Sequence, residues 1–311
     1  MSLSKDLQKV GVDTLGDPSD EALLPMITSC SPGWVRFIEL NYPELLPHLS
    51  TCKSPHQMFG AIIKSYYAEK AGIDPKKIFV ISVMPCTAKK YERSREEMKN
   101  NELDNVDAVI TTRELARMIK QANIQFADLE NAEFDDPMGE ATGAGAIFGV
   151  TGGVMEAALR TAYETVTGDT LGKVDFEDVR GKTGVKKATI KMGDTEVKVA
   201  VAHGLGNARK ILEEIKEGKA EYQFVEIMGC PGGCIMGGGQ PIVSSKKRSQ
   251  YPVRELRAKA IYTIDEQSEI RKSHENPVVK KVYKDYLGEP GGHKAHELLH
   301  THYAAREKYR I

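Results

Sequence analysis

The sequence predicts an α/β fold of two lobes, with mainly parallel sheets flanked by helices and a helical C-terminal tail. Short apolar runs alternate along the chain with segments of helical spacing, which is typical of parallel strands joined by crossover helices. Three of the predicted strands run directly into cysteine loops, at Cys30, Cys86 and Cys230. Because the carboxyl ends of parallel strands border one crevice, we expect these thiols at a shared site.

The elements follow from local signals along the chain. Short apolar runs predict strands over residues 23–29, 79–84, 107–110 and 224–228, the first two of them buried. Helical spacing predicts helices over residues 55–72, 112–123, 153–167 and 207–222, the first of them stopped by a glycine. Residues 186–205 predict a hairpin that turns at Gly193-Asp194.

The chain changes character near Lys246. Residues 1–245 contain all of the cysteines, and we assign them to an α/β catalytic domain that contains the metal site. Residues 246–311 are polar, helical in spacing and free of cysteine. We interpret them as a helical tail that wraps the α/β body and has no core of its own.

Composition excludes several classes of protein. Lys and Arg number 43 against 44 Asp and Glu, so the net charge of −1 provides no field for nucleic acid or an anionic membrane. No stretch is apolar over the length of a membrane span, and the N-terminus has no secretory core or twin-arginine pair. These features predict a cytoplasmic protein. Its five cysteines, an odd number without an export signal, indicate metal or redox chemistry and not a disulfide framework.

The loop at residues 226–241 reads EIMGCPGGCIMGGGQP and places Cys230 and Cys234 four positions apart. Thiolates around one iron–sulfur cluster need a backbone that turns tightly and approaches closely, and glycine permits both. A structural zinc site is the plainer alternative. Structural zinc usually takes two close cysteine pairs, however, and this sequence has no second pair.

Two other loops supply candidate thiols. In MPCTAKKYE, Cys86 ends a predicted strand, and Lys89 is expected to place a cation beside that thiolate. Such a cation lowers the thiol pKa and can donate hydrogen bonds to an anionic ligand. In TSCSPGW, Cys30 precedes Trp34, the only tryptophan, for which packing in the core is the ordinary interpretation.

These three loops, in this order, resemble the three signatures of the catalytic domain of [FeFe]-type, iron-only hydrogenases: TSC(C/S)PxW, MPCxxKxxE and ExMxCxxGCxxGGGxP. The intervening segments SPHQMFGA and DAVITTREL are similar to that family as well. The tail is similar to the family's small-subunit region fused to the large one. The resemblance spans roughly residues 22–311.

By this resemblance the chain binds the H-cluster, a [4Fe–4S] cubane joined through one cysteine sulfur to a di-iron subsite with CO, CN⁻ and a bridging dithiolate. Cys86, Cys230 and Cys234 match cubane ligands, with Cys234 at the bridging position. Lys89 matches the residue that bonds a cyanide. Cys30 matches the cysteine that passes protons to the amine of the dithiolate.

The resemblance also assigns the walls of the site. The residues that match the lining of the di-iron pocket are Met84, Met228, Phe148, Pro55 and Ser54. The residues that match hydrogen-bonding groups near the site are Ser50 and Glu92. Heterolytic cleavage of H2 needs an open iron site with a proton relay beside it, and soft thiolates suit iron–sulfur clusters.

The implied reaction is the reversible oxidation of H2 to protons and electrons. The implied partners are H2, protons, ferredoxin or another iron–sulfur electron carrier, and radical-based maturation proteins that load the cluster, with no nucleic acid and no membrane. The N-terminal strand and helix of the family's first lobe and its ferredoxin-like cysteine runs are absent from this sequence. We therefore expect either that electrons come from a separate protein or that this chain is a fragment or a shortened paralogue.

Two further departures from the family concern the site. Many relatives have a second cysteine at the position of Ser31, which leaves three alternatives for the fourth cubane ligand: Cys30, Ser31 through its oxygen, or Cys52. Cys52 is equally well interpreted as a small buried residue. The family's acidic segment before the first loop is also missing, and whether Asp13 or Glu21 replaces its proton-path glutamates stays open. His56 lies in the SPHQ segment, where we expect it near the cluster, although a core or solvated histidine is the first interpretation.

A non-catalytic relative, an iron–sulfur protein that senses redox state or serves cluster assembly, is the second hypothesis. Ser31 and the shortened first lobe favour it. Cys30 and the complete MPCxxKxxE loop favour the hydrogenase, because a protein that only holds a cubane needs neither a proton relay nor a cyanide partner.

Overall fold

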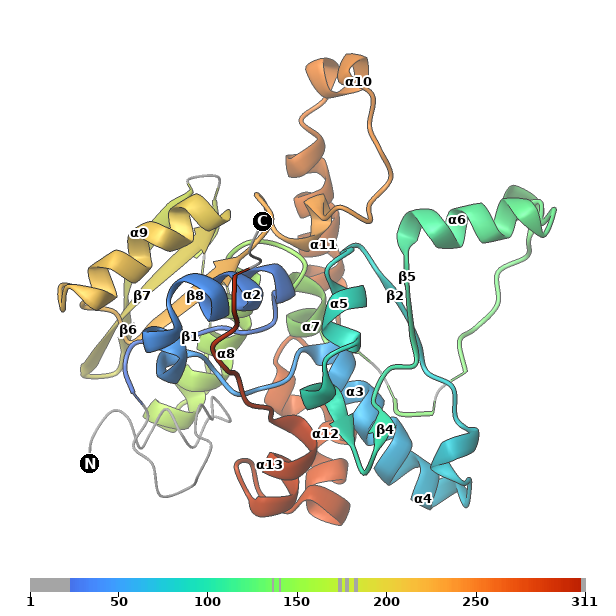
Figure 1. Cartoon of the computed structure of the whole chain (residues 1–311), viewed down its shortest axis with the longest axis horizontal. Helices are drawn as coiled ribbons and strands as arrows, with labels where there is room; N and C mark the ends of the chain where they lie inside the picture. Colours follow the sequence, from blue (N-terminus) through green and yellow to red (C-terminus); the bar gives the residue numbers. More distant parts are fainter. Residues whose placement is uncertain are drawn as a thin grey trace.

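The structure is a computed structural model that describes residues 23–308 except 136, 140, 173–174, 177–178 and 182–183. Asp13 and Glu21, considered above for a proton path, lie outside the described residues. Figure 1 shows sheets flanked by helices, with the C-terminal segments packed along the body. Within the described part of the chain, each helix is too short or too polar to cross a bilayer.

The larger sheet has four strands in the order β1 (Met26–Ile27), β8 (Phe224–Met228), β7 (Thr195–His203) and β6 (Val185–Met192). Strand β8 pairs in parallel with β1 and β7, whereas β6 and β7 form the predicted antiparallel hairpin. The strands predicted over residues 23–29 and 224–228 are confirmed as β1 and β8, although β1 keeps only two residues. Because β1 and β8 are parallel neighbours, the loops that follow them, with Cys30 and Cys230, leave the same edge of the sheet.

A second, two-stranded sheet pairs β2 (Ile81–Met84) in parallel with β5 (Ala108–Thr111). Both strands were predicted, but the prediction that β2 is buried is wrong. Phe79, Ile81 and Val83 are 68%, 54% and 44% exposed, because only the opposite face of β2, with Ser82, packs against the body. A short antiparallel pair, β3 (Lys99–Asn100) and β4 (Leu103–Asp104), follows β2 in the chain.

The α-helices are α2 (Pro32–Asn41), α3 (Pro55–Ile62), α4 (Ala68–Ala71), α5 (Lys89–Arg93), α6 (Thr112–Gln121), α7 (Gly143–Ile147), α8 (Gly153–Thr167), α9 (Leu205–Lys216), α10 (Ser245–Gln250), α11 (Val253–Gln267), α12 (Pro277–Val282) and α13 (His293–Leu299). Short 3₁₀ segments are η1 (Pro43–His48), η3 (Pro75–Lys77), η4 (Glu96–Met98), η5 (Phe126–Asp128), η7 (Cys234–Met236) and η8 (Ser273–Glu275), and π-helical segments are η2 (Ile63–Tyr67) and η9 (Tyr283–Leu287). The helix predicted over 55–72 consists of α3, η2 and α4 and ends at the left-handed Gly72, as expected.

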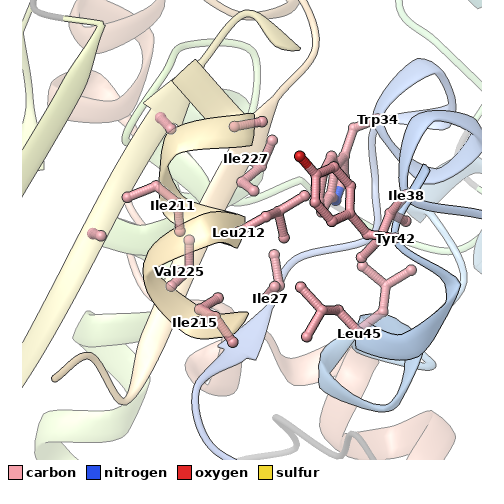
Figure 2. Close-up of a cluster of buried hydrophobic side chains, with 14 of the residues drawn as sticks. Ile27, Trp34, Ile38, Tyr42, Leu45, Ile211, Leu212, Ile215, Val225 and Ile227 are labelled. Carbon is pink, nitrogen blue, oxygen red and sulfur yellow. The ribbon is translucent and has the colours of Figure 1, made fainter. Parts of the chain in front are cut away.

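The larger sheet is covered on both faces because its side chains alternate between them. Ile27, Val225 and Ile227 point to one face and join the core formed with α2 and α9, which Figure 2 shows around Trp34 and Leu212. The residues on the other face, among them Met26, Phe224, Val199 and Val201, pack against Met155 and Leu159 of α8. Trp34 is fully buried, which confirms its core role.

The C-terminal helices share their cores with earlier elements. Val282, Leu287 and Leu298 pack against Ile62 and Tyr66 of the α3–η2 helix. Tyr262 of α11 packs against the cluster of α7 and α8. This packing supports the interpretation of the tail as a wrapping segment, and the boundary at 245/246 stays a prediction.

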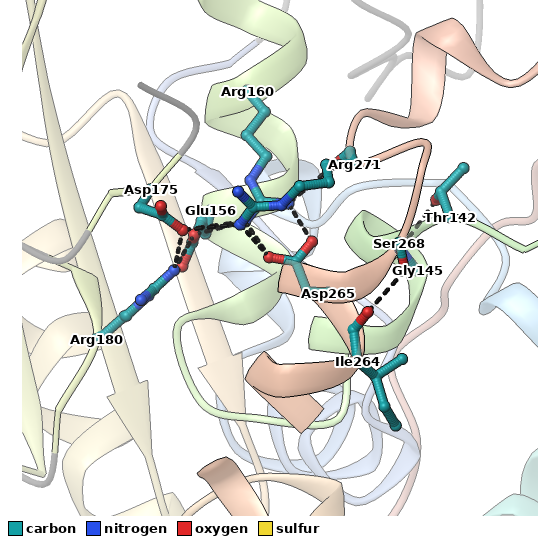
Figure 3. Close-up of polar contacts among 10 residues, drawn as sticks. All are labelled: Thr142, Gly145, Glu156, Arg160, Asp175, Arg180, Ile264, Asp265, Ser268 and Arg271. Atoms are coloured by element: carbon teal, nitrogen blue, oxygen red, sulfur yellow. Dashed lines mark hydrogen bonds and ion pairs between the residues drawn. The ribbon is translucent and has the colours of Figure 1, made fainter. Parts of the chain in front are cut away.

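A buried ion network fastens α8 to α11 (Figure 3). The Arg160 guanidinium, fully buried, donates to Glu156 on its own helix at 2.8 Å and to both carboxylate oxygens of Asp265 at 2.7 and 2.8 Å. Arg180 donates to both oxygens of Glu156, and Arg271 donates to one Asp265 oxygen that also accepts from Arg160. The network therefore ties the α/β body to the C-terminal region by paired, hydrogen-bonded charges.

Helix α6 depends on its N-cap. Thr111 Oγ1 accepts the Glu114 amide at 3.2 Å, and Glu114 accepts the Thr111 amide at 2.7 Å, while no α6 side chain is buried. Thr111→Ala removes half of this capping box, which is worth about 1 kcal/mol. We expect amide exchange in α6 to accelerate about fivefold, measured by hydrogen–deuterium exchange mass spectrometry. T111S should retain the slower exchange, and equal rates in T111A and the unaltered protein would contradict the assignment.

Candidate metal centre

The three cysteine loops meet at the ends of β1, β2 and β8. The Gly229 amide donates to Ser31 Oγ at 3.1 Å, which links the loop after β8 to the loop after β1. The Gly239 amide donates to the Pro85 carbonyl at 2.8 Å, which links the same loop to the one after β2. The shared site predicted from the three strand ends is therefore present as a junction of three loops.

The structure brings four cysteines close enough for the charge of one thiolate to affect the pKa of another: Cys30, Cys86, Cys230 and Cys234. Burial raises the pKa of Cys30 to about 12 and that of Cys234 to about 11. The negative charge of a Cys234 thiolate raises the pKa of Cys30, and thiolates at Cys86 and Cys230 raise the pKa of Cys234. A thiolate at Cys86 also raises the pKa of Cys230. A metal cluster would bind these cysteines as thiolates, by displacing their protons.

The spacing of the thiols does not suit a single zinc ion. Zinc bonds of 2.3 Å in a tetrahedron bring sulfurs about 3.8 Å apart. Among the described residues, the one group of three candidate ligand atoms within 4.8 Å of one another is Glu164, His274 and Glu275, and it contains no cysteine. Lys272 already bridges Glu164 and Glu275 at 2.7 Å each, so that group is a satisfied ion cluster.

Ser31 and Cys52 are engaged elsewhere. The Ser31 hydroxyl accepts the Gly229 amide and so serves the loop junction. Cys52 lies in an isolated bridge with His300, and its carbonyl accepts the Ser29 hydroxyl at 2.9 Å. Burial raises the pKa of Tyr303, and the Cys52 thiol adds to that rise. The Cys30 thiol lies within the electrostatic influence of Cys234, and the choice among the three alternatives for a fourth ligand stays a prediction.

Lys89 lies at the centre of a buried polar chain. Its ammonium donates to the Cys30 carbonyl at 2.9 Å and to both oxygens of Glu92 at 2.9 and 3.1 Å. Ser54 Oγ donates to Glu92 at 2.8 Å, and His56 Nε2 contacts the same oxygen. Burial opposes the charge on Glu92, yet the Lys89 ammonium and the His56 hydrogen bond hold the pKa of Glu92 below its ordinary value.

This placement corrects one detail of the prediction for Lys89. The sequence suggested a cation beside the Cys86 thiolate of the same loop. The structure turns the ammonium to the Cys30 carbonyl, where it opposes the burial-driven rise in the pKa of both Cys30 and Cys234. The cause is α5, which begins at Lys89 and directs its side chain across to the first loop.

The remaining predicted wall residues are dispersed around the junction. Met84 ends β2 and is half-buried, Met228 ends β8 and is 2% exposed, and Phe148 follows α7 and packs against its core. Pro55 is exposed at the first position of α3. Ser50 is buried and accepts the Cys52 amide at 3.3 Å, so its hydroxyl serves the local backbone.

Comparison with family models supplies the deciding observation. Residues 12–238 match the iron only hydrogenase large subunit, C-terminal domain, and residues 251–306 match the iron hydrogenase small subunit. The chain belongs to the iron-only hydrogenase family.

Individual members of this family, and more distant relatives, agree with that assignment. The NADP-reducing hydrogenase subunit HndD of Solidesulfovibrio fructosivorans is 52% identical over 98% of this chain, which spans 51%, about half, of that relative's length. A solved variant of apo [FeFe]-hydrogenase HydA1 from Chlamydomonas reinhardtii has a TM-score of 0.80 and 43% identity, covering 98% of this chain and 83% of that one. The cytosolic Fe-S cluster assembly factor narfl of Danio rerio is 30% identical over 93% of this chain and 71% of that protein. The α/β fold predicted from the sequence is thereby confirmed as the fold of the solved [FeFe]-hydrogenase structures.

Two arginines hold the glycine-rich loop of this iron-only hydrogenase family member and were missed in the sequence. Arg113 of α6 donates to the Gly238 carbonyl at 2.6 Å. Arg257 of α11 donates to the Ile235 carbonyl at 2.8 Å. Both lie in helical segments far from the loop in sequence, and no spacing signal connects them to it.

The same loop requires glycine for space at one position and not at its neighbour. A Cβ at Gly237 would lie 2.3 Å from the Pro85 carbonyl oxygen, whereas a Cβ at Gly238 would meet only the Thr87 side chain, at 3.3 Å. Gly237→Ala should push the loops apart at a cost of about 1–3 kcal/mol and lower iron bound per chain about tenfold. G238A is the matched control and should bind iron normally. Equal iron content in the two variants, measured after anaerobic reconstitution, would refute the close approach.

Proposed function

We propose that this chain is the H2-converting part of an iron-only hydrogenase and catalyses H2 ⇌ 2 H⁺ + 2 e⁻. The observation that carries the proposal is the junction of three loops, where four coupled thiols lie beside a buried lysine bonded to the Cys30 carbonyl. A protein that only stored a cubane would have no use for a buried cation that is held by a carboxylate, itself bonded by two further donors.

The residues present fit the H-cluster on two counts. The donor set is soft thiolate, which suits iron–sulfur chemistry. The glycines at 232 and 233 take positive φ, and a Cβ at Gly233 would lie 2.7 Å from the Thr151 amide, so the loop forms a cradle only glycine allows. Cys86, Cys230 and Cys234 would hold the cubane, and the bound cluster would supply the redox-active, H2-binding iron.

The chain's own groups would manage charge and protons. Lys89 would donate to an anionic ligand, with Glu92 fixing its position. The Cys30 thiol, whose pKa burial raises to about 12, holds a proton at Sγ beside the Cys234 site and is the group we assign to proton transfer. Met228, almost fully buried, would help to exclude water.

The proposed partners follow from the redox balance. Each H2 oxidised delivers two electrons, which would pass to ferredoxin or another iron–sulfur carrier or subunit. Radical-based maturation proteins would load the di-iron subsite.

Infrared spectroscopy of the anaerobically matured protein, joined to an assay of H2 uptake and evolution, tests the proposal. CO and CN⁻ stretching bands together with H2 turnover are the expected result. A cubane signal without those bands would overturn it.

The second candidate function is cluster assembly or redox sensing without catalysis. The distant likeness to the narfl assembly factor and the presence of Ser31 in place of a second cysteine support it. A matured protein that shows all of the CO and CN⁻ stretching bands but turns over no H2 at any potential would favour this alternative.

A further inference from the structure

Besides Lys89 and Ser54, Glu92 has a further partner in the imidazole of His56. His56 Nε2 contacts Glu92 Oε2, and His56 Nδ1 lies 3.0 Å from Ser82 Oγ. The imidazole is 6% exposed. It extends from the first turn of α3 and bridges Ser82 on β2 to Glu92 on α5, so one side chain fastens three elements together.

The two contacts fix the tautomer of the ring. A carboxylate only accepts hydrogen bonds, so Nε2 carries the hydrogen and donates it to Glu92. In the neutral ring Nδ1 then accepts, and Ser82 supplies the donor hydroxyl. Burial is the main cause that lowers the pKa of His56, which keeps the ring neutral at pH 7.

The clamp reaches the metal site through one further residue. Glu92 receives the Lys89 ammonium on both oxygens, and that ammonium also donates to the Cys30 carbonyl. An ammonium has three N–H groups, and the two Glu92 oxygens and the Cys30 carbonyl accept all three, so an anionic ligand would share an N–H whose direction Glu92 and Cys30 fix. A shift of the Glu92 carboxylate would redirect it.

We propose that His56 is a positioning residue that clamps Glu92 and thereby sets the direction in which Lys89 presents its N–H groups to the anionic ligands of the cluster. The inference rests on the proposed function. Because the ring is neutral, replacing it with a neutral side chain removes a hydrogen bond without changing the charge of the site.

The test compares three variants with the unaltered protein. His56→Leu removes the donor, His56→Gln keeps an N–H donor at similar reach, and Ser82→Ala removes the hydroxyl that donates to Nδ1, which leaves the ring held at Nε2 alone. In matured protein we expect the CN⁻ stretching bands to shift in H56L, to return toward their normal positions in H56Q, and to broaden in S82A. We expect kcat in H56L to fall about tenfold with KM for H2 unchanged, because His56 touches no substrate.

The same comparison is made by NMR on the cluster-free protein, using the Nε2–H signal of His56 and the ammonium signal of Lys89, assigned through its loss in K89R. A Lys89 signal that moves in H56L and recovers in H56Q is expected. The inference would be overturned by an unchanged Lys89 signal in H56L. Unchanged CN⁻ band positions in H56L protein that shows all of its CO and CN⁻ bands would overturn it as well. Absence of all CO and CN⁻ bands in the unaltered protein would instead overturn the proposed function, and the NMR comparison would still decide the role of His56.

Discussion

Replacing Cys234 by alanine is expected to leave the chain without iron and without H2 turnover. Cys234 is the thiol coupled to all three others, and it follows a turn that only glycine permits. Changes outside the ligand set typically cost 10–100-fold in metal affinity, and loss of a direct ligand should exceed that. Iron and acid-labile sulfide per chain after anaerobic reconstitution, with H2 uptake measured on the same samples, check the prediction.

Two other cysteine variants serve as controls. Cys52→Ala should retain its iron, because Cys52 lies beside Tyr303 and its backbone pairs with His300. Cys30→Ala should retain iron yet lose H2 turnover by roughly 10²–10⁴-fold, the usual contribution of a positioned proton carrier. Iron lost in C52A, or kept in C234A, would show that the cysteines have been assigned wrongly.

The second large effect concerns stability. Arg160→Leu should lower the free energy of unfolding by about 3–5 kcal/mol, because it leaves the buried carboxylates of Glu156 and Asp265 without their shared partner. Arg180 and Arg271 remain on these carboxylates but approach from partly exposed positions and cannot fill the space. Denaturant unfolding of the cluster-free protein measures the change.

Lys198→Ala is the matched surface control. Its ion pair with Glu221 at 2.6 Å is solvent-exposed on both sides, so we expect no resolvable change in the free energy of unfolding. An R160L protein as stable as K198A would mean that the network in Figure 3 contributes specificity alone. The double variant R160L/D265L would then separate lost attraction from an unpaired charge.

Much of the fold and the gathering of the cysteines could be predicted, because both follow from local patterns. Parallel strands end at one edge, so cysteines at the ends of β1 and β8 had to lie near each other. The helix of α8 was predicted over its observed residues, since its glycine borders and apolar spacing are strong signals.

The polar chain around the site could not be predicted, because its partners are distant in sequence. Nothing at residue 56 indicates that its ring meets Ser82 and Glu92, and a core or solvated histidine was the ordinary interpretation. The exposure of β2 was missed for a similar reason. An apolar strand has the same sequence pattern whether one of its faces is covered or both. Only its neighbours in the folded protein decide how many of its faces are buried.

The open face of β2 has a consequence for colloidal behaviour. Among the described residues β2 and β5 have no further strand beside them, and Phe79, Ile81 and Val83 present apolar side chains to water along that sheet. Uncovered strand edges with apolar faces are templates for chain-to-chain association. Salting-out ions strengthen such contacts, so sulfate-rich buffers should promote precipitation of the isolated chain, and low-salt handling should suppress it.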